Sequence, residues 1–142
     1  MLIKLEISRL SMIPQEKALN LIHDEYARLD ELIGVDSSQI EIKISTRLKR
    51  HYGYFMYKPK LRIVIANAAL RSYKIFYEVI RHEYAHAALW LLEPGVDHKH
   101  DLRWRDMARQ VGCIPRATIK LEKIDDFHPQ NEQLSILNIL QK

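Results

Sequence analysis

The residues His82, Glu83 and His86 form an H-E-x-x-H pattern in a segment that no Gly or Pro interrupts before Pro94. In an α-helix, side chains four residues apart lie on one face, so the two imidazoles can bind a single metal ion. Glu83 lies beside that face, where its carboxylate can hold a water molecule and accept its proton. Neutral imidazoles suit Zn²⁺. The pattern therefore predicts zinc-dependent peptide hydrolysis with one zinc ion per chain.

A third zinc ligand must come from outside this segment, because catalytic zinc sites have three protein ligands and keep the fourth position open for water. Leu92 stands where a metzincin has its third histidine, which excludes that class. The segment that follows offers His98, His100 and Asp97. We expect His100 to be the ligand, because it lies where the next helix begins and its backbone is better fixed, with His98 as the substitute.

Three helices are predicted around these residues. Apolar residues and both motif histidines recur at helical spacing and predict a helix at about 73–92. Similar patterns predict helices at 15–33 and at about 101–111, which Gly34 and Gly112 end. The motif histidines should therefore face the interior of the protein.

Three short segments before the motif have the pattern of β-strands. Residues 40–44 alternate strictly between apolar and polar, and apolar and aromatic residues dominate 52–57 and 61–66. Residues 58–60 contain Pro59 and suit a hairpin turn. The fold class is therefore α+β, with a small antiparallel sheet of about three strands packed on the metal-site helix.

The length and composition indicate one globular domain. The chain has 142 residues, of which 47% are hydrophobic and 28% charged, which is an ordinary balance for a protein with a core. We expect a single domain over residues 1–142, made of an N-terminal helical part at 1–36, a core with the metal site at 38–113 and a C-terminal tail at 114–142. Within the tail we expect a last strand at 118–121 and a short helix or docking segment around 134–140.

Cys113 is the only cysteine of the sequence and cannot form an internal disulfide, which fits a reducing cytoplasm. It also excludes a four-cysteine zinc ribbon in this sequence. The first residues have no apolar run of signal-peptide length, and no segment has the length of a membrane span. We therefore expect a cytoplasmic protein without a membrane partner.

Basic residues are concentrated in the predicted strand region. Residues 42–77 contain nine Lys and Arg and no Asp or Glu, whereas the formal net charge of the whole chain is only +4. Cations neutralise phosphates and aromatic rings can stack on unpaired bases. The candidates for contact with DNA or with substrate are Arg47, Lys49, Arg50, Tyr52, Tyr54, Lys58, Lys60 and Arg62. A solvated sheet face or an acidic protein substrate would explain the same pattern.

Residues of about 40–113 resemble the SprT-like zinc metallopeptidase domain, a family that includes the DNA–protein crosslink protease Spartan. The resemblance rests on the H-E-x-x-H motif, on the strand-like segment 61–70 before it, and on the run from His100 to Trp104. It implies a compact zincin-like fold, with His82, His86 and His100 as the zinc ligands and Glu83 as the catalytic carboxylate. The sequence departs from the family at Asp101, where glycine is usual, and lacks the cysteine-rich zinc ribbon of many members.

These observations predict a zinc metallopeptidase that hydrolyses protein substrates, with DNA-bound proteins as one candidate class. A zinc-activated water would attack the peptide, Glu83 would act as the general base, and an exposed edge strand would bind the extended peptide. The candidates for stabilising the oxyanion are Tyr52, Tyr54, His98 and Arg103. The alternative is a zinc-containing module that binds nucleic acid or protein with little or no proteolysis. The presence of Glu83 favours the enzyme, because a structural zinc ion needs no general base.

Overall fold

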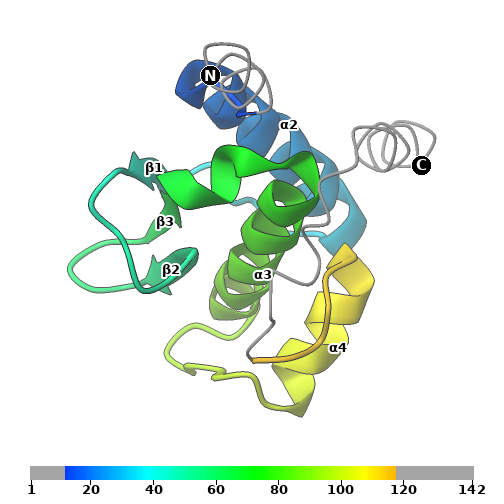
Figure 1. Ribbon diagram of the computed structural model, residues 1–142. Helices are drawn as coiled ribbons and strands as arrows, with labels where there is room; N and C mark the ends of the chain where they lie inside the picture. Colours follow the sequence, from blue (N-terminus) through cyan, green and yellow to red (C-terminus); the bar gives the residue numbers. More distant parts are fainter. Residues whose placement is uncertain (1–11, 118–142) are drawn as a thin grey trace, which may run out of the picture.

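The computed structural model describes residues 12–117, which combine helices with a small sheet (Figure 1). The elements in chain order are α2 (Gln15–Ile33), β1 (Glu41–Ser45), β2 (Gly53–Met56), β3 (Arg62–Ala66), the 3₁₀ helix η1 (Asn67–Arg71), α3 (Tyr73–Leu92) and α4 (Leu102–Val111). The predicted α+β class is confirmed. The strand expected at 118–121 and the helix expected around 134–140 lie outside the described residues. None of the helices within 12–117 is both long and apolar enough to cross a membrane.

The three-stranded sheet is mixed, so the predicted antiparallel arrangement is wrong for one strand. The hairpin of β2 and β3 is antiparallel, with Tyr54 opposite Val64. However, β1 lies on the other side of β3 and runs parallel to it, with Lys43 opposite Val64. An alternating sequence indicates which side chains face the core, but it does not specify the neighbouring strand or its direction. The order β1-β3-β2 therefore could not be obtained from the pattern alone.

The helix boundaries follow from local capping. The Oγ atom of Ser72 accepts a hydrogen bond from the backbone N–H of Ile75 at 3.1 Å and caps the start of α3. Gly34 and Gly112 end α2 and α4 with a φ of +86°, a left-handed conformation that costs glycine little. The three predicted helices are confirmed to within one residue.

The metal-site helix α3 lies between the sheet and α4 (Figure 1). The central strand β3 is buried from Ile63 to Ala66 and packs on one flank of α3. The other flank of α3 contacts α4, whose Trp104 is fully buried. The two helices that carry or adjoin the candidate ligands thus share one hydrophobic core.

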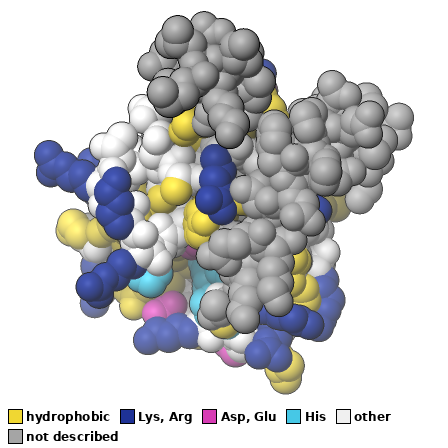
Figure 2. Space-filling model, in the orientation of Figure 1, with side chains coloured by type: hydrophobic (Ala, Val, Ile, Leu, Met, Phe, Trp, Pro, Cys, Tyr) yellow, Lys and Arg dark blue, Asp and Glu magenta, His cyan; other side chains and the backbone are white. Residues whose placement is uncertain are grey.

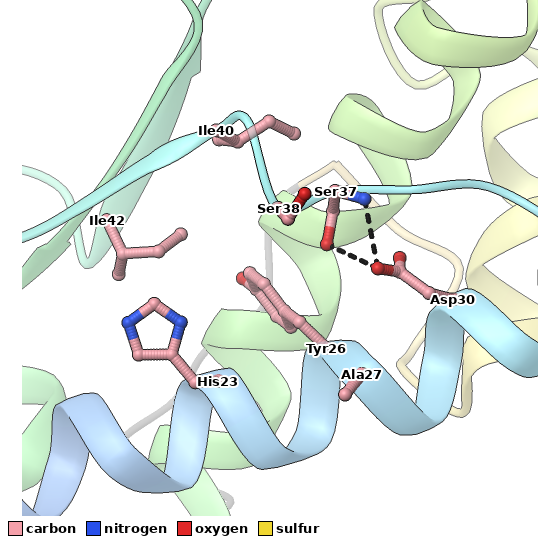
Figure 3. A pocket seen from close by; sticks show the side chains of 8 residues that line it. All are labelled: His23, Tyr26, Ala27, Asp30, Ser37, Ser38, Ile40 and Ile42. Carbon is pink, nitrogen blue, oxygen red and sulfur yellow. Dashed lines mark hydrogen bonds between the residues drawn. The ribbon is translucent and has the colours of Figure 1, made fainter.

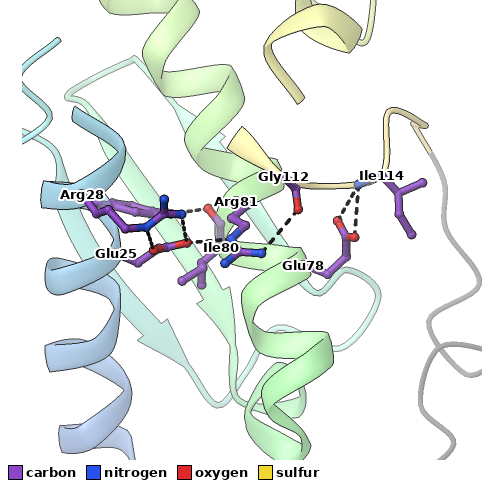
Figure 4. Close-up of polar contacts among 8 residues, drawn as sticks. Glu25, Arg28, Glu78, Ile80, Arg81, Gly112 and Ile114 are labelled. Carbon is purple, nitrogen blue, oxygen red and sulfur yellow. Dashed lines mark hydrogen bonds and ion pairs between the residues drawn. The ribbon is translucent and has the colours of Figure 1, made fainter. Parts of the chain in front are cut away.

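Buried polar contacts also tie α3 to its neighbours, just before the histidine motif (Figure 4). Arg81 donates to Glu25 of α2 at 2.7 Å, and Arg28 donates to the same carboxylate at 2.7 Å. Burial opposes ionisation of Glu25, but the two guanidinium groups outweigh it and lower the pKa of Glu25. On the α4 side, Glu78 accepts from the backbone N–H of Ile114 at 3.0 Å. These contacts hold α3 without involving the motif histidines.

Candidate metal centre

Helix α3 and the loop before α4 bring three histidine nitrogens together. Nε2 of His100 lies 3.0 Å from Nε2 of His82 and 3.1 Å from Nε2 of His86. One ligand nitrogen from each of the three residues lies within 4.8 Å of the others. Around a tetrahedral zinc ion with Zn–N distances of about 2.0–2.1 Å, ligand nitrogens are about 3.3 Å apart. The three histidines are therefore positioned to bind a metal ion.

The substitute ligand His98 does not join this triad. Its buried imidazole directs Nδ1 to Oδ2 of Asp101 at 2.7 Å. Its backbone oxygen lies 3.1 Å from Nδ1 of His86. A carbonyl oxygen only accepts, so His86 must donate the Nδ1 proton, and this leaves its Nε2 atom free to bind a metal. The structure thus brings His100 to the motif histidines and directs the side chain of His98 elsewhere.

Burial keeps the triad histidines neutral. Burial, followed by the neighbouring histidines, lowers the pKa of His82 to about 3 and that of His86 to about 4. The pKa of His100 is also lowered, again mainly by burial. Metals bind neutral imidazole, so protons compete only weakly for these nitrogens at neutral pH.

Glu83 is buried next to the triad, with only 6% of its surface exposed. Burial raises the pKa of Glu83 to about 8. A cation bound to the histidines would favour the ionised carboxylate. Glu83 is thus a titratable carboxyl group with little exposure to bulk water, adjacent in sequence to a candidate ligand.

Gly53 has a role that the sequence analysis missed. A Cβ atom at this position would lie 2.9 Å from the backbone oxygen of Val64 and 3.3 Å from Cγ of Glu83. Any side chain would therefore force β2 away from its neighbours. The available signal was a glycine inside an apolar and aromatic run, which is typical of a close backbone approach.

Trp104 packs against all three histidine rings. Its ring centroid lies 4.7 Å from that of His82, 5.2 Å from that of His86 and 4.6 Å from that of His100. A fully buried indole in this position restricts the rotation of the imidazoles. The sequence indicated only that Trp104 belongs to the apolar side of the second helix and to the family-like run after His100.

The residues expected to stabilise the oxyanion are largely occupied by other contacts. Tyr54 of β2 is 40% exposed and keeps its side chain toward solvent. The other three bind polar partners: Tyr52 binds Arg71 at 2.9 Å, Arg103 binds Glu93 at 3.0 Å, and His98 binds Asp101 at 2.7 Å.

A separate hollow of about 110 Å³ lies between α2 and the start of β1 (Figure 3). Inside it, the carboxylate of Asp30 accepts hydrogen bonds from the N–H and hydroxyl of Ser37 at 2.9 Å and from the hydroxyl of Tyr84 at 2.7 Å. These bonds join α2 to the connection before β1 and to α3. No residue of the histidine triad lines the hollow, whose lining comprises His23, Tyr26, Ala27, Asp30, Ser37, Ser38, Ile40 and Ile42.

A comparison with family models matches residues 16–123 to the SprT-like family. The match is wider than the segment 40–113 that carries the recognisable motifs, and it includes α2. No curated protein matches the chain. Because the family model covers most of the sequence, including the histidine triad and Glu83, the chain belongs to the SprT-like family.

Proposed function

We propose that the protein is a zinc-dependent peptidase that cleaves protein substrates. The observation that carries this proposal is the convergence of three neutral histidines beside the buried carboxylate of Glu83. Three imidazole ligands leave one position of a tetrahedral ion for water, as catalytic zinc sites do. A structural zinc usually has a fourth protein ligand, and the nearby His98 is directed to Asp101 instead. The donor set therefore favours a catalytic role.

Glu83 carries out the proton transfers in this proposal. Zinc, when bound, would lower the pKa of a water molecule and would polarise the carbonyl group of the peptide bond. The carboxylate of Glu83 accepts the proton of that water and then passes it to the leaving nitrogen. Trp104 and the hydrogen bond from His86 to the carbonyl of His98 keep the imidazoles in their binding orientation.

The edge strand β2 is the proposed binding site for the substrate backbone. It lies at one edge of the sheet, and an edge strand can pair with an extended peptide through main-chain hydrogen bonds. The missing side chain of Gly53 lets the start of this strand approach Glu83 closely. A peptide bound along β2 would therefore run toward the catalytic carboxylate.

Replacement of His82, His86 or His100 with Ala is expected to reduce bound zinc from one equivalent to nearly none, because each change removes one of three ligands. Metal analysis of the purified proteins after dialysis measures this loss, and cleavage of a casein-type substrate should disappear with it. His23→Ala is the control, since this exposed histidine of α2 lies outside the triad. Full zinc in His100→Ala together with zinc loss in His98→Ala would contradict the ligand assignment.

A second proposal concerns DNA contact close to the same site. Three basic residues are exposed in the connection 46–52, which leads directly to Gly53: Arg47, Lys49 and Arg50. Among the described residues, no acidic side chain forms an ion pair with these three. Figure 2 displays Lys and Arg side chains around the face on which histidine side chains are visible. A protein bound to DNA could then reach Glu83 while this connection contacts the phosphates.

The other basic candidates fit this contact less well, because they lie at the opposite end of β2. Lys60 and Arg62 both form ion pairs with Glu41 of β1, which neutralises part of their charge. Lys58 is exposed in the same turn. Tyr54 is exposed on β2 and can stack on a base, whereas Tyr52 is partly buried. The connection 46–52 and Tyr54 are therefore the favoured contact surface.

Replacement of Arg47, Lys49 and Arg50 with Ser is expected to weaken DNA binding and to lower the slope of log affinity against log salt by about three, since each phosphate contact contributes about 0.9. Zinc content and cleavage of a DNA-free substrate should not change. The control replaces three exposed basic residues of the helices, Lys17, Lys74 and Arg109. Equal salt slopes in the two variants would reject the contact, and DNA binding without any cleavage would favour a binding module.

A further inference from the structure

The loop between α3 and α4 supplies two parts of the metal centre. It carries His100, and it presents the backbone oxygen of His98 to Nδ1 of His86 at 3.1 Å. His100 has a φ of +56°, a left-handed conformation that is uncommon for residues other than glycine. Such a conformation persists only where the surrounding contacts hold it. The contacts that hold this loop therefore affect both ligands.

The side chain of His98 is the main internal contact of the loop. It is only 9% exposed, although its neighbours Asp97 and Lys99 are exposed. Its Nδ1 atom donates to Oδ2 of Asp101 at 2.7 Å, because a carboxylate can only accept. The other oxygen of Asp101 accepts from the backbone N–H of Trp104 at 2.9 Å and caps α4. The imidazole of His98 is thus fixed to the first turn of α4.

The second nitrogen of His98 faces the beginning of the loop. Its Nε2 atom lies 3.2 Å from Oε2 of Glu93, but the two groups are not aligned for a hydrogen bond. Glu93 is itself bound by Arg103 of α4 at 3.0 Å. The imidazole of His98 therefore lies between Glu93 at the start of the loop and Asp101 at its end. Of these two contacts, only the one with Asp101 is a hydrogen bond.

We propose that His98 is a positioning residue of the metal centre. The hydrogen bond from its side chain to Asp101 fixes the loop. In the fixed loop, the backbone carbonyl of His98 orients His86, and the imidazole of His100 faces the two motif histidines. This inference depends on the proposed function only in requiring that the triad binds a metal; it does not require peptide cleavage. Groups that orient metal-binding histidines typically contribute about 10- to 100-fold in metal affinity.

His98→Ala is expected to lower zinc affinity by about 10- to 100-fold in a competition with a chelator. It should also alter the visible spectrum of the cobalt-loaded protein, which reports the ligand geometry. His98→Asn is expected to restore most of the affinity, because the amide nitrogen of Asn can take the place of Nδ1 and donate to Asp101. His98→Gln places its amide nearer to the position of Nε2 and should restore less.

Asp101→Ser tests the same bond while His98 stays in place. The Ser hydroxyl oxygen can still cap α4, but the second carboxylate oxygen, which accepts the proton of His98 Nδ1, is absent. This variant should lower zinc affinity as much as His98→Ala does, and the double variant should lose little more than either one alone. Lys99→Ala, an exposed position in the same loop, is the control and should bind zinc normally.

Unchanged zinc affinity and an unchanged cobalt spectrum in His98→Ala would overturn the proposal. Complete zinc loss in both His98→Ala and His98→Asn, with normal binding in Asp101→Ser, would also overturn it, because His98 would then be a ligand. If His98→Ala fails to fold, the difference between His98→Asn and His98→Gln and the result for Asp101→Ser decide the question. A lack of peptidase activity in the unchanged protein would contradict the proposed function without affecting these zinc measurements.

Discussion

Glu83→Gln is expected to bind one equivalent of zinc and to cleave substrate about 100- to 10,000-fold more slowly than the unchanged protein. Glutamine has nearly the same shape as glutamate but does not accept a proton, and Glu83 is not one of the three converging histidines. The loss should therefore appear in kcat, with little change in KM. Metal analysis and the cleavage rate of a casein-type substrate measure the two quantities on the same preparation.

Glu78→Gln is the matched control for this experiment, because Glu78 also lies on α3 but lies before the motif. Its side chain accepts from the backbone N–H of Ile114, and glutamine can accept the same hydrogen bond. This variant should retain cleavage. Full proteolysis by Glu83→Gln would mean that another group accepts the proton, and the proposed mechanism would be rejected.

The metal-free protein is expected to become more stable at alkaline pH when Glu83 is replaced with Gln. Burial raises the pKa of Glu83 from 4.5 to about 8 in the folded state. Between these values the folded state holds a proton that the unfolded state lacks, so the free energy of unfolding falls as the pH rises. Glutamine does not ionise, so its replacement of Glu83 removes this loss of stability at high pH. Urea unfolding with a chelator should give Glu83→Gln an advantage on the order of 2–4 kcal/mol at pH 8, and almost none near pH 4.5.

The triad histidines produce the opposite slope on the acid side. Burial holds the pKa of His82 at about 3 and that of His86 at about 4, below the unfolded value of 6.5. As the pH falls from 6.5, the unfolded state takes up protons first and the folded state loses stability. These groups place the greatest stability of the metal-free protein near pH 6.5. The control is Glu16→Gln, at an exposed position of α2, whose free energy of unfolding should equal that of the unchanged protein at every pH. If Glu83→Gln also gave the same curve as the unchanged protein, burial would not raise the pKa of Glu83.

The helices could be predicted from the sequence because their determinants are local. Apolar residues at helical spacing indicate where each helix lies, and the terminating glycines Gly34 and Gly112 indicate where α2 and α4 end. The three strands were also predicted, but their order was not. The position of β1 beside β3 depends on the contacts of β1 with β3 and with α2, and no short segment carries that information.

The candidate site also has one part that could be predicted from the sequence and another that could not. One helical turn determines the approach of His82 and His86, so their four-residue spacing was sufficient to predict it. The choice between His98 and His100 depends on a left-handed backbone and on a bond to Asp101, which are tertiary features. The contact of Gly53 with Glu83 joins residues from different elements, and a single sequence contained only an indirect sign of it.

The contacts that tie α3 to α2 and to the segment after α4 have a consequence for how the protein acquires its metal. Small zinc domains such as zinc fingers are unfolded without the ion. Here Arg81 with Glu25, and Glu78 with the backbone of Ile114, hold the helix in place through contacts that no metal supplies. We therefore expect folding and metal loading to be separable events. We expect the chain to fold first and to bind its metal ion afterwards, so that the supply of the ion, rather than the folding of the protein, sets when the site becomes competent.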